Sequence, residues 1–197
     1  MVARLTRRRA LAAGLSAAMM PLAYGERSIA PARASDIETG AAAGVGARAL
    51  NWLEMHNLHT GRKLRVTFRD ASGFVASALG QLDRLLGDHR SGEHREMDRQ
   101  LYVLLADLAA AAHVEPRYEI ISGFRSSATN EKLRANGGGQ AKNSQHIHGK
   151  AADVRLKGVP TAVLRDLAVA LKRGGVGWYP KSDFVHVDTA RVRYWEG

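Results

Sequence analysis

The chain of 197 residues contains no cysteine, and this absence limits what it can fold into more than any other feature. A disulfide framework, a thiolate metal site and a cysteine nucleophile are all excluded. The fold must therefore rest on a buried apolar core, and an apolar content of 45% is typical of a globular domain. Any metal ion must be held by histidine, aspartate or glutamate side chains.

Residues 1–34 have the three-part organisation of an export signal. A basic start is followed by a mildly apolar stretch of about 14 residues, which is too short to span a bilayer, and by small residues before a cleavage point after Ala34. The pair Arg7-Arg8 is typical of a twin-arginine signal. We expect a flexible lead-in at residues 35–48 and no membrane anchor after processing.

The formal net charge of +10 is divided between this signal and the rest of the chain, where basic residues are spread out rather than gathered in one stripe. A basic surface suits any anionic partner, including a cell-wall polymer. The dispersed charge and the export signal both argue against a nucleic-acid partner. We expect a monomer that does not bind nucleic acid.

Apolar periodicity predicts an α+β domain over residues 49–197, with a small, mostly antiparallel sheet backed by helices. Alternation of apolar and polar residues predicts strands, whereas apolar spacings of three and four predict helices. In chain order we expect a strand at 64–69, helices at 75–86 and 97–108, a strand at 118–121, a helix at 128–135, a strand at 151–156, a helix at 160–171, and strands at 176–178 and 184–188.

Two clusters of polar residues in the C-terminal third carry the chemistry. His146, Asp153 and His186 can supply two imidazoles and one carboxylate, which are ligands that a catalytic zinc uses with a fourth position open for water. No regular element enforces the spacing from His146 to Asp153. The residues alone therefore leave a second interpretation open, in which His146 and His148 are exposed loop residues and Asp153 only begins a strand.

Longer motifs resemble a known family. The series Ser144-x-His146-x-x-Gly149-x-Ala151-x-Asp153, followed by the late His186, is similar to the zinc motif of the M15-type D-alanyl-D-alanine peptidases. Five further segments resemble its murein endopeptidase K-like branch: Asn57-x-His59-Thr60-Gly61, Leu86-x-Asp88-His89-Arg90, Ser122–Asn130, Gly174–Tyr179 and Phe184–Thr189. The resemblance covers roughly residues 49–195.

This resemblance implies the hedgehog/D-Ala-D-Ala peptidase fold and a periplasmic zinc peptidase that cuts peptide cross-links of peptidoglycan, with the stem peptides as its partners. Carried over by position, His146, Asp153 and His186 hold one zinc ion per chain. Arg125 stabilises a developing oxyanion or binds a substrate carboxylate. The sequence leaves open whether 3–3 or 4–3 cross-links are cut. Two alternatives are a D-alanyl carboxypeptidase and a non-catalytic peptidoglycan-binding module.

Two carboxylates compete for the role of general base. Many M15 enzymes carry a glutamate three residues before the last histidine ligand, and Asp183, one methylene shorter, occupies that position here. A turn near Ser182 is needed to bring its carboxylate to the water. Asp188 lies two residues after His186, on the same strand face. We expect Asp183 to be the base and Asp188 to orient His186.

The remaining motif residues are given structural roles. We expect His59 to be structural and His148 to be a loop residue or a substrate contact. Trp178 and Tyr179 either form one wall of the substrate groove or pack in the core.

Overall fold

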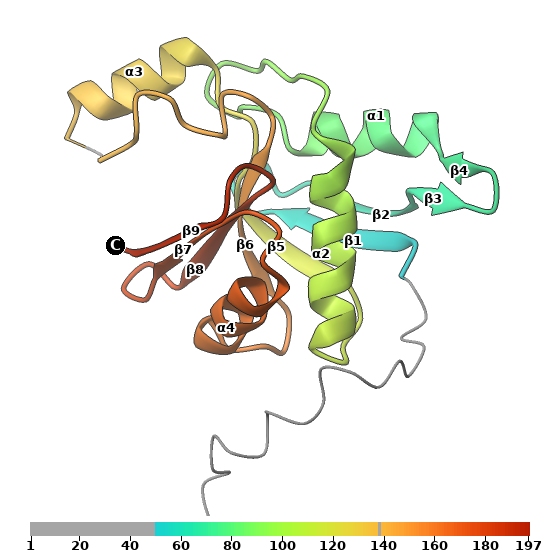
Figure 1. Ribbon diagram of the computed structural model, residues 1–197. Coiled ribbons are helices and arrows are strands. Elements are labelled where there is room, and N and C mark those ends of the chain that lie inside the picture. Colours follow the sequence, from blue (N-terminus) through green and yellow to red (C-terminus); the bar gives the residue numbers. More distant parts are fainter. Residues whose placement is uncertain (1–49, 138) are drawn as a thin grey trace, which may run out of the picture. The chain divides into compact units, whose positions relative to one another are not determined.

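The computed structural model describes residues 50–137 and 139–197, which are drawn in colour in Figure 1. The expected export signal at residues 1–34 and the lead-in at 35–48 lie outside the described residues. Within the two described ranges, no helix combines the length and the apolar character that a bilayer crossing requires.

The described part of the chain contains both helices and strands. The elements are β1 (Trp52–Asn57), β2 (Lys63–Thr67), β3 (Arg69–Asp70), β4 (Gly73–Phe74), α1 (Ala76–Leu85), α2 (Arg99–Ala111), β5 (Arg117–Ser122), α3 (Ser127–Ala135), β6 (Ala151–Leu156), α4 (Thr161–Leu171), β7 (Gly175–Tyr179), β8 (Phe184–Asp188) and β9 (Arg193–Glu196). Seven strands form one sheet in the order β2-β1-β5-β6-β8-β7-β9, and β3 and β4 form a separate hairpin.

The main sheet is mixed. β1 pairs with β5 in parallel and β7 pairs with β9 in parallel, whereas the other neighbours in the sheet are antiparallel. The α+β class is therefore confirmed, but the expectation of a mostly antiparallel sheet is wrong. A parallel pair needs a crossover connection, and α1 and α2 lie between β1 and β5 along the chain. The last strand, β9, adds the second parallel pair.

The expected helices and the five expected strands are confirmed with shifted ends, whereas β1, β9 and the β3–β4 hairpin were not predicted. The start of α2 differs for a local reason. The Asp98 side chain accepts a hydrogen bond from the backbone amide of Gln100 at 3.0 Å and caps the helix. Met97 therefore lies before the helix, although its side chain is buried.

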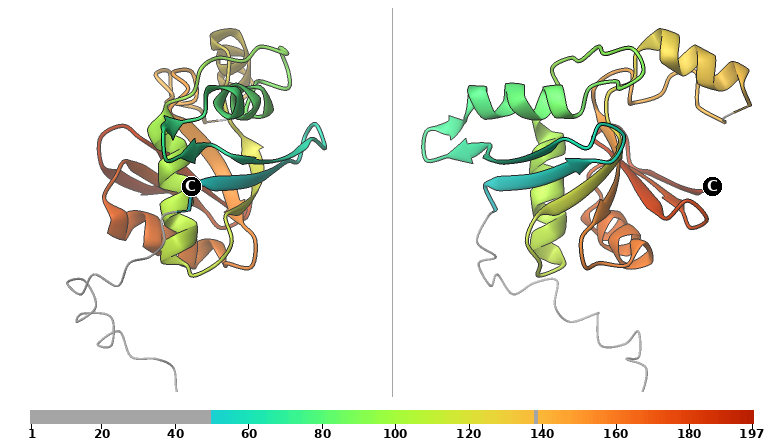
Figure 2. Two further views of the ribbon diagram at one scale, coloured as in Figure 1. Left: turned by 90° about the vertical axis from the view of Figure 1, so that its right-hand side faces the viewer. Right: turned by 180° about the vertical axis from the view of Figure 1, so that it is seen from behind.

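Helices α2 and α4 pack against the sheet and against each other, whereas α3 stands apart from it (Figures 1 and 2). Leucines of α1 and α2 meet the inner faces of the strands. The largest fully buried side chains are Tyr102, Phe68, Leu53, Met55, Leu82, Leu86, Met97, Leu101, Leu105, Leu108, Ile120 and Leu156. Burial of an aliphatic side chain of this size contributes about 1.5–3 kcal/mol. This core fixes the sheet on which the polar cluster is built.

One sequence motif holds the turn between β1 and β2. Oδ1 of Asn57 accepts hydrogen bonds from the backbone amides of His59 at 3.0 Å and Thr60 at 3.1 Å. Nδ2 of Asn57 donates to the carbonyl oxygen of Leu85 at 2.9 Å, which ties the turn to the end of α1. The exposed ring of His59 stacks on His89 with ring centroids 4.0 Å apart.

A carboxylate inside the core joins α1 to α2. Asp83 is 8% exposed, and its Oδ1 accepts hydrogen bonds from the Tyr102 hydroxyl at 2.6 Å and the Met97 backbone amide at 3.1 Å. Burial and the neighbouring carboxylate raise the pKa of Tyr102 far above its ordinary value. The hydroxyl therefore remains a hydrogen-bond donor at all working pH values.

We expect Tyr102→Phe to lower the free energy of unfolding by about 1–3 kcal/mol, because the buried carboxylate loses a donor while the ring volume is kept. Tyr194→Phe is the matched control, since Tyr194 is 52% exposed. Its effect should stay within about 0.5 kcal/mol. Urea unfolding of both variants measures the difference, and equal stability of the two would contradict the role given to Asp83.

Candidate active site

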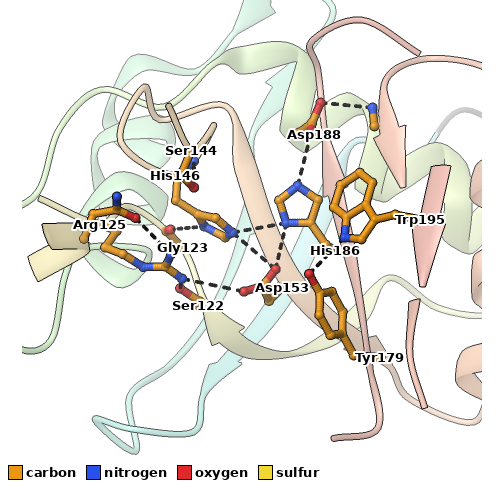
Figure 3. Close-up of polar contacts among 12 residues, drawn as sticks. Ser122, Gly123, Arg125, Ser144, His146, Asp153, Tyr179, His186, Asp188 and Trp195 are labelled. Carbon is orange, nitrogen blue, oxygen red and sulfur yellow. Dashed lines mark hydrogen bonds and ion pairs between the residues drawn. The ribbon is translucent and has the colours of Figure 1, made fainter. Parts of the chain in front are cut away.

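Two strands and one loop bring the expected metal ligands together (Figure 3). Asp153 on β6 and His186 on β8 are direct partners in the antiparallel register of these strands. His146 comes from the loop before β6, in which Gly149 turns the chain with a φ of 66°. A Cβ at Gly149 would lie 2.9 Å from the backbone oxygen of Glu96, so this turn has no room for another residue type.

The inner atoms of the three side chains converge. Nε2 of His146 lies 3.1 Å from Nδ1 of His186, and Oδ1 of Asp153 lies 2.9 Å from Nδ1 of His186 and 3.2 Å from Nε2 of His146. Across residues 50–137 and 139–197, these residues form the one cluster of His, Asp and Glu that could hold a metal ion. All three are buried, whereas His148 is exposed. The interpretation of His146 as an exposed loop residue is therefore wrong.

The outer nitrogens of both imidazoles face groups that only accept hydrogen bonds. Nδ1 of His146 lies 2.6 Å from the carbonyl oxygen of Gly123, and Nε2 of His186 lies 3.0 Å from Oδ2 of Asp188. Each outer nitrogen must carry a proton to make its bond, which leaves a lone pair on each inner nitrogen of a neutral ring. Together with the carboxylate of Asp153, three acceptors then face one another.

Three acceptors at these distances require a positive charge between them. Either His186 takes a second proton on Nδ1 or a metal ion binds. Two imidazoles and one carboxylate form a ligand set of catalytic zinc sites, which keep the fourth position open. Hydrogen bonds to a carbonyl and a carboxylate on the outer nitrogens are the usual means of orienting histidine ligands. The donor set therefore fits a zinc ion.

The ionisation of the cluster is set by competition between burial and pairing. Burial alone would raise the pKa of Asp153 and lower that of His186. For Asp153, the attraction and hydrogen bonds of His146 and His186 outweigh burial and hold its pKa well below the usual range. For His186, the hydrogen bonds to Asp153 and Asp188 outweigh burial and raise its pKa. Asp153 is therefore ionised, as a metal ligand must be.

Asp188 lies fully buried on the outer side of His186 (Figure 3). Its Oδ1 accepts hydrogen bonds from the backbone amides of Gly175 at 3.0 Å and Ala190 at 2.9 Å, and its Oδ2 lies 2.6 Å from Nη2 of Arg193. Burial opposes ionisation, but the hydrogen bonds from His186, Arg193 and these amides prevail and hold the pKa well below its usual range. These contacts suit a carboxylate that orients His186.

Asp183 lies away from the cluster, in the turn between β7 and β8. The turn that the sequence requires near Ser182 is present, and Asp183 has a φ of 51°. Its carboxylate accepts a hydrogen bond from Oγ1 of Thr161 at 3.0 Å and lies 3.2 Å from Nε of Arg155. The side chain is 65% exposed. The structure therefore does not bring Asp183 together with the three expected ligands.

Arg125 lies beside the cluster with only 8% of its surface exposed. Its Nη2 lies 4.0 Å from Oδ2 of Asp153 and 3.2 Å from Oγ of Ser122, and its Nη1 lies 3.4 Å from Oδ1 of Asn130. Burial lowers the pKa of Arg125, although the charge of Asp153 opposes this shift. A guanidinium remains charged at working pH, so a fixed positive charge stands next to the expected metal site.

The cluster and Arg125 line a cavity of about 720 Å³. Its lining includes Gln140, Asn143 and Gln145 from the loop before β6, together with the aromatic residues Tyr179, Phe184 and Trp195. Tyr179 thus forms a wall, as one of the two interpretations has it, whereas Trp178 packs against the core. A cavity lined by both amide and aromatic residues suits a peptide.

Trp195 and Arg193 are lining residues that sequence reasoning missed. The Trp195 ring lies 5.1 Å from the His186 ring, centroid to centroid, and its indole N–H donates to the Tyr179 hydroxyl at 2.9 Å. A Cβ at Gly177 on β7 would overlap the Trp195 indole. Gly177, within the motif Gly174–Tyr179, was therefore a signal that a large side chain packs on that strand.

Comparison with known proteins agrees with the motifs. Residues 45–195 match the family described as peptidoglycan L,D-endopeptidase MepK. The protein of that name from Escherichia coli K12 is 36% identical over 143 residues, which cover 73% of this chain and 79% of that protein. The probable peptidoglycan L,D-endopeptidase MepK of Haemophilus influenzae is 40% identical over 146 residues, which cover 74% of this chain and 78% of that protein.

The matched range contains the three converging residues together with Arg125 and Asp188. The resemblance to the murein endopeptidase K-like branch is therefore confirmed. Because the family match spans residues 45–195 and these relatives are 36% and 40% identical, the chain belongs to the MepK family of M15-type peptidoglycan endopeptidases.

Proposed function

We propose that the chain is a zinc-dependent endopeptidase that hydrolyses peptide cross-links of peptidoglycan. The observation that carries this proposal is the convergence of three acceptor atoms, from His146, Asp153 and His186, on the wall of a cavity suited to a peptide. The relatives named as peptidoglycan endopeptidases support the substrate class. The three residues would hold one zinc ion per chain.

A zinc ion held there supplies the Lewis acidity that activates water and polarises a carbonyl group. The chain supplies the rest of the chemistry. Gly123 and Asp188 fix the two imidazoles through their outer nitrogens. Arg125 stabilises the negative charge that develops on the substrate oxygen, or binds a substrate carboxylate in two-point fashion. The amide and aromatic walls align the stem peptide across the cavity.

The stereochemistry in the relatives' names narrows the bond that is cut. An L,D-endopeptidase cleaves between an L centre and a D centre. A 3–3 cross-link joins two diaminopimelate residues through such a bond, whereas a 4–3 cross-link joins D-alanine to a D centre. We therefore infer that 3–3 cross-links are the substrate of this chain.

Proton transfer is assigned to Asp183, which occupies the family's glutamate position. Its carboxylate must leave Thr161 and Arg155 to serve the cavity, and its exposure leaves the side chain room to turn. The contacts of Asp188 support a different role for that residue, which is to hold His186 in place from its outer side.

A peptidoglycan endopeptidase acts outside the cytoplasm, and the basic N-terminal segment supports export by the twin-arginine route. We expect replacement of Arg7 and Arg8 by lysine to leave the precursor in the cytoplasm, which cell fractionation measures. Appearance of the processed chain outside the cytoplasm at the normal rate would contradict this route and favour a general secretory signal.

We expect incubation of purified sacculi with the full chain to convert 3–3 cross-linked muropeptide dimers into monomers, and a chelator to prevent this conversion. Muropeptide chromatography before and after zinc is restored measures both effects. Loss of 4–3 links alone would overturn the bond assignment, and release of free D-alanine would identify a carboxypeptidase. Tight binding to sacculi without any product would identify a non-catalytic module.

Ligand substitutions connect this activity to the cluster. His186→Ala should lose about one zinc per chain and nearly all activity, because the site keeps only two ligands. His148→Ala is the matched control: it removes an exposed imidazole two residues from His146 and should keep both zinc and activity. Elemental analysis of dialysed protein gives the zinc content. Stoichiometric zinc in His186→Ala would remove His186 from the ligand set.

We expect Asp183→Asn to bind zinc like the unaltered chain and to lose at least about 100-fold in turnover, the usual scale for general acid–base catalysis. Arg155→Gln is its control, because Arg155 binds Asp183 but is not among the residues that line the cavity, and it should retain turnover. Zinc titration and turnover of both variants decide the matter. Full turnover in Asp183→Asn would limit this residue to its role in the turn.

A further inference from the structure

The edge strand β9 contributes a side chain to each side of the His186 ring. The Trp195 ring lies against the His186 ring, with the centroids 5.1 Å apart and the ring planes tilted by 53° (Figure 3). Arg193 binds Asp188 on the outer side of the ring. The guanidinium of Arg193 also lies 5.1 Å from the centroid of the Trp195 ring. One strand thus supplies two of the side chains that lie around the His186 imidazole or its partner Asp188.

Arg193 donates hydrogen bonds from two nitrogens to the carboxylate of Asp188. Nη2 donates to Oδ2 at 2.6 Å and Nη1 donates to Oδ1 at 3.2 Å. This is the two-point contact that a planar guanidinium makes with a carboxylate, and lysine cannot reproduce it. Nη1 is held in turn by the carbonyl oxygen of Arg191 at 3.1 Å. The guanidinium therefore has a fixed orientation.

The two carboxylate oxygens of Asp188 have different partners on the His186 side and on the backbone side. Oδ1 is held by the backbone amides of Gly175 and Ala190, whereas Oδ2 has two partners, Nη2 of Arg193 and Nε2 of His186. Without Arg193, Oδ2 of Asp188 would keep only the hydrogen bond from Nε2 of His186. The position of the ring therefore depends on a residue that does not touch it through a hydrogen bond.

We propose that Arg193 is a positioning residue that acts through Asp188 to keep Nδ1 of His186 turned toward Asp153 and His146. This inference rests on the proposed function, because its consequence is the affinity of the three ligands for zinc. Arg193 also lines the cavity, so a direct contact with a substrate carboxylate is the competing role. The two roles predict different measurements.

A double-mutant cycle on metal-stripped full-length protein tests the proposal. Zinc affinity is measured for the unaltered chain, Arg193→Gln, Asp188→Asn and the double variant by competition with a chromophoric chelator. Each single variant should lose about 10–100-fold in affinity, as other groups that orient metal ligands do. In the Asp188→Asn background, Arg193→Gln should cost no more than about 2-fold, because residues that act as one unit are not additive.

Two further measurements separate positioning from general damage. Arg191→Gln removes the same charge two positions earlier, at an exposed side chain, and should leave zinc affinity unchanged. Arg193→Lys keeps the charge without the two-point contact and should fall between the unaltered chain and Arg193→Gln. Visible spectra of the cobalt-substituted variants report whether the ligand geometry has changed. If Arg193→Gln fails to fold, Arg193→Lys replaces it both alone and in the Asp188→Asn background, and the same comparison is made.

Equal losses from Arg193→Gln in both backgrounds would overturn the proposal, because Arg193 would then act independently of Asp188. Unchanged zinc affinity combined with a raised KM would also overturn it and assign Arg193 to the substrate. These failures differ from failure of the proposed function, in which the unaltered chain itself would bind no zinc.

Discussion

The hydrogen bonds on the outer nitrogens of His146 and His186 are the constraint on which the rest of the site depends. The Gly123 carbonyl and the Asp188 carboxylate accept hydrogen bonds from the protonated outer nitrogens. The inner nitrogens of the neutral rings therefore face Asp153 as unprotonated acceptors. Burying three such groups is costly unless a cation lies between them. The site therefore requires a positive charge at its centre, which either a second proton on Nδ1 of His186 or a metal ion would supply.

Close packing behind the two rings explains why the motifs contain glycine. A Cβ at Gly123 would overlap the carbonyl oxygen of Leu86, and one at Gly175 would lie 2.5 Å from Oδ2 of Asp188. At Gly177 it would overlap the indole of Trp195. Side chains at these positions would displace the groups that orient the histidines, and glycine within or beside a strand often marks such a close approach.

The sequence was sufficient for the helices and for the cluster of His146, Asp153 and His186, but not for the sheet order. Leucine periodicity located α1, α2 and α4. The motif around His146 located the cluster because imidazole and carboxylate side chains are the groups that bind a catalytic zinc ion. The strand β9 has only four residues, two charged and two aromatic, which is too short for a clear periodicity, and its pairing with β7 depends on the whole sheet. Arg193 and Trp195 were missed for this reason.

The orientation of the Asp183 side chain could not be predicted from the local sequence either. Its direction depends on a positive φ and on Thr161 and Arg155, which lie on other elements. The pattern required a turn near Ser182 and the turn is present, but a turn alone does not determine where its side chains point. Side-chain direction in loops depends on tertiary partners, whereas Asp153 and His186 lie on strands that pair directly with each other.

The tautomers of the two ring systems give the most direct test of the central claim. Nitrogen-15 NMR of the zinc-loaded protein, labelled at histidine, distinguishes protonated from metal-bound ring nitrogens. The account predicts protons on Nδ1 of His146 and Nε2 of His186, with zinc on the other nitrogen of each ring. Zinc on Nδ1 of His146 or on Nε2 of His186, or spectra that zinc leaves unchanged, would contradict it.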